Sequence, residues 1–546
     1  MTDHYLDRLA RTINENWDQP ALTDFYLTED GSAQDTSRGN HYTYGEMYEE
    51  ICRVAELLTS LGLQKGDHIA ICGANSAHWV IAYLAIAKMQ GVSVTVMHSL
   101  MPDEIARLVA FSDAKALFTD EDLWEELATS HRPYMGDLSS VISLSDWSLL
   151  SGCPHRAMTV KRERRTAECP VDSQGVSAPR EFAERIQNSL KPRRPRDNRD
   201  ISFPQSNPDS LAMICFTSGS TGGAKGIMLS MCNMSNNSQN IIDGYPDVEN
   251  KLFLSILPMS HIYGFMTEII GQLLKGKDVR ILSSLLTINN LYCAIKITQP
   301  YALSMIPQIV SALMDSHADC IELMLRSVQQ MYIGGALFGK DKEKQLYAAG
   351  VPISIGYGMT ETGPLISYSI HPLYRPNTCG KIVSGMTARI SPVGEILVKG
   401  ENVMLGYYKD PEATARKIDS DGWLHTGDKG HLDEDGYLYV EGRLNQDMIV
   451  LPNGENIHPE DIERHINALP EVKESIVLAR DGKLVAIAVP QITNHQSQIT
   501  NSDLRRHILR TVNPSLPLYS QLYDVEITDT SLAKTEKQTL KRYLYK

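Results

Sequence analysis

Residues 216–226 read Phe-Thr-Ser-Gly-Ser-Thr-Gly-Gly-Ala-Lys-Gly, a short stretch of small hydroxyls and glycines with a single lysine. Because glycine tolerates positive φ, the backbone N–H groups of such a loop can close around an anion. The hydroxyls add further donors, and Lys225 supplies a mobile positive charge. A Walker A loop is excluded, since its spacing of glycines, lysine and hydroxyl cannot be fitted here. The stretch is therefore either a cradle for a polyphosphate or a glycine-rich surface turn.

Apolar patterns around this loop predict the strands and helices that hold it. The run 211–216 leads into the loop and has the length and composition of a buried strand. Strand patterns at 67–72 and 92–97 flank a helical pattern at 77–90, which indicates a right-handed crossover in a parallel sheet. The same alternation predicts further helices over 4–17, 47–61 (opened by Thr43 and Glu46 as a cap), 103–112, 267–274 and 288–298, and further strands over 116–119, 252–257, 278–282 and 302–306.

Length and composition narrow the class of protein. A chain of 546 residues is too long for one compact core, so two or more domains are expected. The net charge of −14 argues against general binding of nucleic acids, which calls for a basic surface. The nine cysteines are scattered with no Cys-x-x-Cys pair, as is typical of reduced thiols in a cytosolic enzyme without a zinc site. We find neither a secretory signal pattern at the start nor an apolar run of about 18 residues that would predict a membrane span.

Two further stretches carry side chains suited to a nucleotide. Residues 356–361, Gly-Tyr-Gly-Met-Thr-Glu, follow the apolar run 351–355. Glycines beside an aromatic ring permit close approach of a nucleobase, Thr360 can reach a phosphate, and the Glu361 carboxylate is a hard oxygen ligand suited to Mg²⁺. Asp428 ends the stretch Trp-Leu-His-Thr-Gly-Asp, and a carboxylate is a natural acceptor for the two hydroxyls of a ribose. Alternatively, Asp428 caps a turn.

Taken in order, these stretches resemble the signature motifs of the adenylate-forming superfamily, which includes acyl-CoA synthetases, luciferases and the adenylation domains of peptide synthetases. The loop resembles the superfamily's phosphate loop, Thr-Ser-Gly-Ser/Thr-Thr-Gly-x-Pro-Lys-Gly, with Ala224 in place of proline. The resemblance implies that the phosphates of ATP are held by Thr217, Ser218, Gly219, Ser220, Thr221, Gly222 and Lys225. It implies that adenine and the α-phosphate are held by Gly356, Tyr357, Gly358, Met359 and Thr360 with Gly334, Gly335 and Ala336. It also implies that Glu361 binds magnesium and that Asp428 and Arg443 hold the ribose.

A histidine-containing stretch, 258–264, resembles the motif at the entrance of the acyl pocket in this superfamily. The resemblance implies that His261 steers the carboxylate or changes access to the pocket between half-reactions. It also assigns Tyr263 to the pocket, with Gly264 and Gly335 leaving room for an elongated chain. An isolated histidine is more often structural.

The C-terminal part carries two more resemblances and one departure. Residues 454–463 resemble the acyl-CoA synthetase motif that contributes to the thioester-forming conformation, with a hinge expected near Gln446 and Asp447. Residues 532–542 resemble the terminal motif Leu-Pro-Lys-Thr-x-x-Gly-Lys-Ile-x-Arg, but Thr539 stands where the adenylation lysine is expected. Because threonine supplies no cation, either Lys537 or Lys541 reaches in, or adenylation is slow and depends on Mg²⁺ and Lys225. We favour a substitute lysine.

The predicted fold is α/β. Residues 1–442 form a large N-terminal adenylate-forming domain with parallel-sheet subdomains and a β-rich subdomain beginning near Glu395, residues 443–447 the hinge, and residues 448–546 a small mobile α+β domain. Within the first domain, residues 130–207 are predicted to be a basic, proline-containing insertion. This insertion is either a solvated segment or a patch that meets acidic lipids, CoA phosphates or an acidic carrier protein. In the last domain we expect strands over 449–450, 472–479 and 484–489 and helices over 459–468 and 502–511.

Residues 357–367 and 401–408 look most like bacterial long-chain fatty acyl-CoA synthetases. That resemblance implies a cytoplasmic enzyme, at most peripheral to the inner membrane face, that uses ATP, Mg²⁺ and CoA to convert a medium- or long-chain fatty acid into acyl-CoA, AMP and pyrophosphate. Two alternatives stay open: an acyl–acyl-carrier-protein synthetase, and a nucleotide-binding regulatory relative with impaired catalysis. Neither involves nucleic acid.

Overall fold

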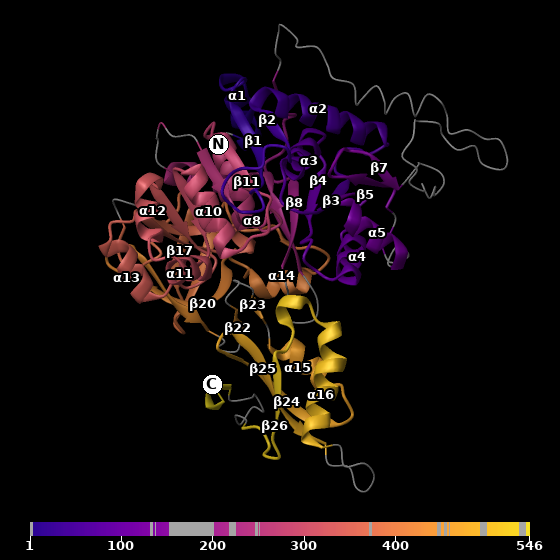
Figure 1. Cartoon of the computed structure of the whole chain (residues 1–546), viewed down its shortest axis with the longest axis vertical. Helices are drawn as coiled ribbons and strands as arrows, with labels where there is room; N and C mark the ends of the chain where they lie inside the picture. The colour runs from indigo at the N-terminus through magenta and orange to yellow at the C-terminus, as the bar shows by residue number, and fades with distance from the viewer. Residues whose placement is uncertain are drawn as a thin grey trace, which may run out of the picture.

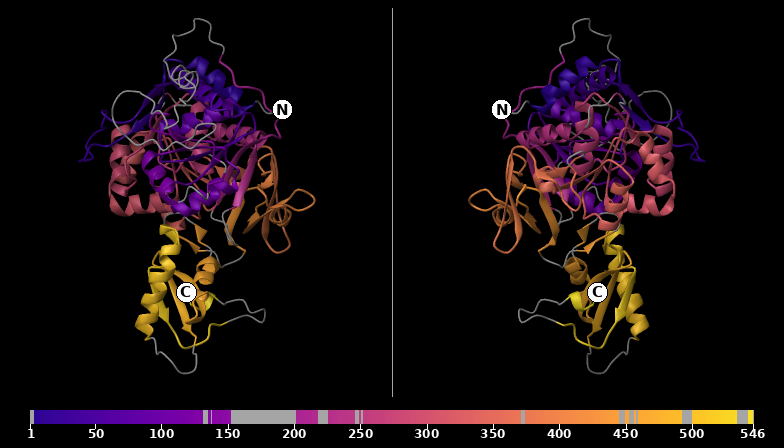
Figure 2. Two further views of the ribbon diagram at one scale, coloured as in Figure 1. Left: turned by 90° about the vertical axis from the view of Figure 1, so that its right-hand side faces the viewer. Right: turned by 90° about the vertical axis from the view of Figure 1, so that its left-hand side faces the viewer.

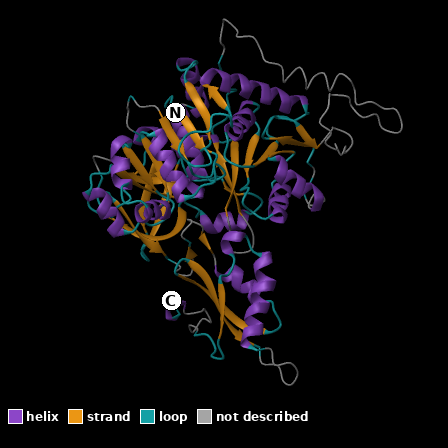
Figure 3. Ribbon diagram, in the orientation of Figure 1, coloured by secondary structure: helices purple, strands orange, loops and turns teal. Residues whose placement is uncertain are grey.

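A computed structural model describes residues 4–130, 135–136, 138–151, 201–217, 225–245, 249, 252–370, 374–444, 449–451, 456–457, 459–491, 500–533 and 542–545. The N-terminal part is the larger, and the C-terminal part, drawn in orange to yellow, lies at one end of it (Figures 1 and 2). In the N-terminal part, helices cover the faces of the large sheets (Figure 3). The predicted α/β fold is confirmed. No helix among the described residues is long and apolar enough to cross a bilayer.

An eight-stranded sheet carries the predicted phosphate loop. Its order is β19-β9-β8-β4-β3-β5-β6-β7, and the central strands from β8 to β6 run parallel. The capping pair Thr43 and Glu46 exchanges hydrogen bonds at the start of α2, as predicted. Strands are β3 (His68–Cys72), β4 (Val92–Thr95), β5 (Ala116–Thr119), β6 (Ser140–Ser143), β7 (Leu149–Ser151), β8 (Leu211–Thr217), β9 (Lys225–Ser230) and β19 (Gly406–Tyr407); helices are α2 (Tyr44–Ser60), α3 (Ala77–Lys88), α4 (Pro102–Phe111), α5 (Glu121–Ser130) and α7 (Met231–Gly244).

The extent of the predicted insertion at 130–207 needs correction at its N-terminal end. Strands β6 and β7 fall within that range, and β6 pairs with β5 inside the sheet. Val141 and Ile142 are fully buried there or nearly so. The sequence hides these strands because each is only three or four residues long. Residues 152–200, with most of the basic side chains, lie outside the described residues.

A nine-stranded sheet packs beside the first, in the order β16-β15-β14-β13-β12-β10-β11-β1-β2, with six parallel strands from β14 to β1. One hydrophobic core joins α1, α2, α3 and α7 to both sheets. Strands are β1 (Pro20–Phe25), β2 (His41–Thr43), β10 (Leu252–Ser255), β11 (Asp278–Leu282), β12 (Ala302–Met305), β13 (Gln330–Ile333), β14 (Ile353–Gly358), β15 (Leu365–Ser369) and β16 (Lys381–Ile382); helices are α1 (Tyr5–Glu15), α10 (Ile288–Thr298), α11 (Pro307–Ser316), α12 (Cys320–Ser327) and α13 (Lys340–Ala348).

The helix predicted at 267–274 starts earlier and contains a wide turn. It runs through α8 (Ile262–Gly264), the π-helical segment η2 (Phe265–Ile270) and α9 (Gly271–Leu274). A π-helical turn disturbs the 3.6-residue period, so the apolar pattern marks only the end of this helix. Such turns occur frequently at functional sites.

The predicted β-rich part is an antiparallel sheet in the order β17-β18-β20-β21, and the C-terminal part has its own hydrophobic core. The C-terminal strands and helices predicted from the sequence are present, whereas the strands at 456–457 and 524–527 are not predicted. The elements are β17 (Met386–Ile390), β18 (Glu395–Gly400), α14 (Pro411–Lys417), β20 (Leu424–Leu432), β21 (Leu438–Arg443), β22 (Ile449–Val450), β23 (Asn456–Ile457), α15 (Pro459–Asn467), β24 (Val472–Arg480), β25 (Lys483–Pro490), α16 (Asn501–Val512) and β26 (Asp524–Ile527), with short 3₁₀ turns η3 (Thr360–Thr362), η4 (Asn513–Ser515), η5 (Leu518–Ser520) and η6 (Arg542–Leu544).

Candidate active site

The predicted phosphate loop connects the two strands of a hairpin. Strands β8 and β9 are antiparallel, with Thr217 opposite Lys225 and Phe216 opposite Gly226. Thr217 ends β8 at the carboxyl edge of the parallel strands, where open α/β sheets bind their ligands. Ser218, Gly219, Ser220, Thr221 and Gly222 lie outside the described residues, so their predicted contacts with phosphate stay predictions.

Lys225 and Glu361 both contact the side chain of Tyr407. The Lys225 Nζ lies over that ring, 4.8 Å from its centroid. The Tyr407 hydroxyl donates a hydrogen bond of 2.7 Å to Glu361 Oε1. Strand β19 brings Tyr407 to this place by pairing with β9, where Tyr407 lies opposite Ile227. Sequence reasoning missed Tyr407, although it lies within the stretch 401–408 that carried part of the family resemblance.

Glu361 is suited to the metal predicted for it. It lies in η3, directly after β14, and its backbone oxygen accepts from Met404 N at 2.9 Å. Among the described residues no three His, Cys, Asp or Glu side chains cluster as a metal cage. Mg²⁺ is commonly held by one or two carboxylates together with substrate phosphates and water, so a single carboxylate fits this ion.

The first half of the stretch 356–361 forms the end of a strand. Gly356, Tyr357 and Gly358 belong to β14, whereas Met359 and Thr360 begin the turn into η3. A Cβ at Gly358 would lie 1.9 Å from the Pro364 oxygen, so the close approach of two backbones requires glycine here. This turn places Thr360 and Glu361 on one side of the strand end and Tyr357 within it.

Asp428, predicted to hold the ribose, lies beside Tyr357. The Tyr357 hydroxyl donates to Asp428 Oδ2 at 2.7 Å, and Asp428 is only 6 % exposed. Thr426 Oγ1 accepts from the Asp428 backbone N–H at 3.0 Å, which fixes the part of β20 that carries the carboxylate. Arg443 lies opposite Asp428 in the β20–β21 pairing. Two segments far apart in sequence, at Tyr357 and Asp428, therefore meet here, and the backbone of Arg443 lies beside the second.

Two polar side chains, the buried Glu268 and the half-buried Asn75, fix the segment that leads to His261. Glu268 Oε2 accepts from Ser255 Oγ and from the backbone N–H groups of Ile256 and Leu257, each at 2.9 Å. From the other side, Asn75 donates to Leu257 O at 2.7 Å and accepts from Met259 N at 2.9 Å. Sequence reasoning missed both Asn75 and Glu268, and no local pattern marks either one.

The titratable groups of this segment favour their neutral forms. Burial raises the pKa of the fully buried Glu268 to about 8, and its three hydrogen bonds only partly oppose that shift. Burial also lowers the pKa of the His261 imidazole. At neutral pH, therefore, both groups are mainly uncharged, and a neutral imidazole can accept or donate one hydrogen bond at each nitrogen.

The residues predicted for the adenine and acyl pockets adjoin one another. A Cβ at Gly334 would lie 3.4 Å from the Tyr263 hydroxyl oxygen and from Gly356 O, so these three segments are in contact. Gly335 has φ +85° and is exposed, and Ala336 follows it. At Gly264 a Cβ would lie 2.8 Å from Leu257 Cβ and from Pro258 O, so this glycine permits tight packing. Its part in an acyl pocket stays a prediction.

Several predicted features lie outside the described residues. These are Lys537, Thr539 and Lys541, the hinge residues Gln446 and Asp447, and Gly454 and His458 of the thioester motif. Near that motif, Gln308 of α11 donates to Leu451 O at 3.4 Å, which places the start of the C-terminal part beside the nine-stranded sheet.

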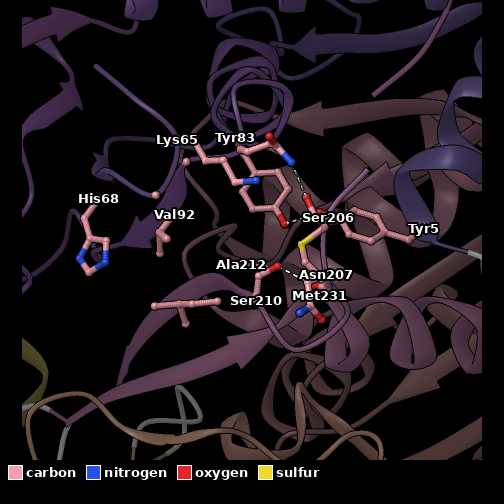
Figure 4. A pocket seen from close by; sticks show the side chains of 15 residues that line it. Tyr5, Lys65, His68, Tyr83, Val92, Ser206, Asn207, Ser210, Ala212 and Met231 are labelled. Atoms are coloured by element: carbon pink, nitrogen blue, oxygen red, sulfur yellow. Dashed lines mark hydrogen bonds between the residues drawn. The ribbon is translucent and has the colours of Figure 1, made fainter. Parts of the chain in front are cut away.

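A cavity of about 390 Å³ lies elsewhere (Figure 4). Lys65, His68, Val92 and Leu211 line it, and they precede or begin β3, β4 and β8, so it opens at the amino edge of these strands. Tyr5 and Tyr83, joined by a hydrogen bond of 2.9 Å between their hydroxyls, form another part of the wall. The phosphate loop is at the carboxyl edge of the same strands, so this cavity is not the candidate active site.

Comparison with known proteins gives consistent matches. A family model described as AMP-binding enzyme matches residues 9–408, and one described as AMP-binding enzyme C-terminal domain matches residues 446–545. A probable CoA ligase of Humulus lupulus is 28 % identical over 463 residues, covering 81 % of this chain and 77 % of the relative. The 4-coumarate–CoA ligase 3 of Arabidopsis thaliana is 26 % identical over 534 residues, covering 93 % and 87 %. The solved o-succinylbenzoate CoA synthetase of Bacillus subtilis has a TM-score of 0.72 at 22 % identity, covering 98 % and 97 %.

Proposed function

The chain belongs to the AMP-binding enzyme family, and on that premise we propose that it is an AMP-forming acid–CoA ligase. The observation that carries the proposal is that Lys225 and Glu361 both contact Tyr407, while Asp428 contacts Tyr357 in the strand that precedes Glu361. A positive charge, a hard carboxylate and an acceptor for ribose hydroxyls are the groups that ATP requires.

In this proposal the enzyme first replaces the poor leaving group of the acid, its carboxylate oxygen, with a good one, AMP. A carboxylate oxygen of the acid attacks the α-phosphorus of ATP, the bond to the bridging oxygen breaks, and pyrophosphate leaves. Lys225 and the loop hold the phosphates, Asp428 holds the ribose, and Lys537 or Lys541 offsets the charge between the two anions. When bound at Glu361, Mg²⁺ neutralises charge on the phosphates. The thiolate of CoA then attacks the acyl carbon, and AMP leaves.

For the acid we propose a medium- or long-chain fatty acid, on the likeness of 357–367 and 401–408 to bacterial long-chain fatty acyl-CoA synthetases. An aryl acid is the alternative, because a relative that covers most of the chain is named for 4-coumarate. The contact of Tyr263 with Gly334 gives this alternative a specific basis, since the aromatic ring of Tyr263 can stack on an aryl acid.

A panel of acids distinguishes these classes. With ATP, Mg²⁺ and CoA, we expect kcat/KM for the best of octanoate, dodecanoate and hexadecanoate to exceed that for 4-coumarate by at least about tenfold. AMP and acyl-CoA should form in equal amounts. Activity on 4-coumarate alone would refute the fatty-acid assignment. Replacing CoA by a purified acyl carrier protein tests the carrier alternative, and no pyrophosphate release with any acid would favour the regulatory one.

A further inference from the structure

We propose that Tyr407 is a positioning residue that keeps the Lys225 ammonium apart from the Glu361 carboxylate, so that each group stays available to its own part of MgATP. The inference rests on the proposed function, because that function assigns phosphate to Lys225 and the metal to Glu361.

The contacts of Tyr407 place it between two opposite charges. Its ring face receives the Lys225 ammonium, 4.8 Å from the centroid, and its hydroxyl donates to Glu361 Oε1 at 2.7 Å. No ion pair joins Lys225 to Glu361, and within the described part of the chain no carboxylate pairs with Lys225. The Lys225 ammonium therefore contacts the ring face of Tyr407, and the Glu361 carboxylate contacts its hydroxyl.

The phenol suits both neighbours. The face of an aromatic ring attracts a cation, whereas a hydroxyl is a donor to a carboxylate. A tyrosine hydroxyl carries its proton at neutral pH, so it is a donor to the Glu361 carboxylate. Tyr407 is only 5 % exposed, and its backbone N–H donates to Thr414 Oγ1 at 2.8 Å, so the ring cannot move aside easily.

Without this ring, the ammonium and the carboxylate would be free to pair. A direct pair would neutralise the charge that attracts phosphate and occupy the oxygen that a metal needs, so it would have to break before MgATP binds. Tyr407 therefore orients the Lys225 ammonium and the Glu361 carboxylate and leaves both unpaired with each other before MgATP binds.

The adjacent Tyr408 provides a matched control. Its hydroxyl donates to Asp113 Oδ2 at 2.7 Å and the Lys409 Nζ lies 5.3 Å from its ring centroid, although here the lysine and the carboxylate also pair directly. Tyr408 therefore contacts a carboxylate and a lysine at the surface, away from Glu361. Tyr408→Phe should therefore leave binding of ATP unchanged.

The test measures binding of ATP by calorimetry, first with EDTA and then across a range of Mg²⁺ concentrations. Tyr407→Phe keeps the ring, so metal-free affinity should stay within about twofold of wild type, while the Mg²⁺ concentration for half-maximal enhancement rises about fivefold. Tyr407→Leu should lower metal-free affinity about tenfold or more. Adding Glu361→Gln to the leucine variant should restore metal-free affinity to within about threefold of wild type, because Lys225 no longer has a carboxylate to pair with.

Each outcome decides a separate question. If wild type binds no ATP, the proposed function fails and the inference falls with it. If wild type binds ATP and the leucine variant binds metal-free ATP equally well, or its loss is not restored by Glu361→Gln, the inference alone is wrong. Should the leucine variant fail to fold, Tyr407→Phe decides: an unchanged Mg²⁺ dependence, or a tenfold loss of metal-free affinity, overturns it.

Discussion

Asp428→Ala is expected to lower kcat/KM for ATP about a hundredfold. The carboxylate is 6 % exposed and adjoins Tyr357, so in the proposed complex it accepts two hydrogen bonds from the ribose with little competition from water. Hydrogen bonds to a charged group contribute about 1.5 kcal/mol or more each, and about 3 kcal/mol corresponds to a factor of about a hundred. Steady-state kinetics with ATP as the varied substrate measures the change.

Comparing ATP with 2′-deoxyATP, in wild type and in Asp428→Ala, separates a role in ribose binding from a structural role. With 2′-deoxyATP, wild type should lose about tenfold in kcat/KM, whereas Asp428→Ala should distinguish the two nucleotides by less than about threefold. Asp421→Ala, at an exposed position in the turn before the same strand, should behave as wild type. If the ratio of kcat/KM for ATP to that for 2′-deoxyATP were the same in wild type and Asp428→Ala, the ribose assignment would be contradicted.

Glu268→Gln is expected to remove a dependence of stability on pH. The pKa of Glu268 is about 8 in the folded protein against 4.5 in the unfolded chain. Between these values the folded state holds a proton that the unfolded state has lost, so stability is greatest at low pH and falls as pH rises, by about 1.4 kcal/mol per pH unit. Glutamine carries no titrating proton, and its side-chain oxygen can still accept from Ser255, Ile256 and Leu257. Relative to wild type, the variant should therefore gain about 3 kcal/mol in free energy of unfolding between pH 5 and pH 7.

Denaturant unfolding at several pH values measures this difference for the transition of the N-terminal part. Because His261 and every other group titrate in both proteins, their contributions cancel in the comparison. Glu29→Gln, at an exposed position, should give the pH profile of wild type. Parallel profiles for Glu268→Gln and wild type would show that Glu268 is charged at neutral pH in the folded protein.

Much of the fold follows from local patterns. The alternation of strands and helices places β3, α3 and β4 correctly because each element has a strong apolar run with a clear boundary. The cap at Thr43 and Glu46 depends on neighbouring residues, so the sequence alone identifies it. The end of β8 at Thr217 is likewise predictable, because small residues and glycines interrupt the apolar pattern there.

What the sequence does not predict depends on contacts between distant segments. Tyr407 becomes part of the site only because β19 pairs with β9, about 180 residues earlier in the chain. Glu268 looks like a surface residue of an amphipathic helix, and its burial follows from the π-helical turn at Phe265–Ile270. Asn75 fixes Leu257 and Met259 across the two large sheets, a contact that no local spacing encodes.

Exchange of labelled pyrophosphate into ATP, with an acid present and CoA absent, tests the central claim most directly. If the chain forms an acyl-adenylate, label should enter ATP at a rate that depends on the acid, on Mg²⁺ and on Asp428, and CoA should not be needed. Label that enters ATP without any acid, or products that are ADP and phosphate instead of AMP and pyrophosphate, would contradict the account.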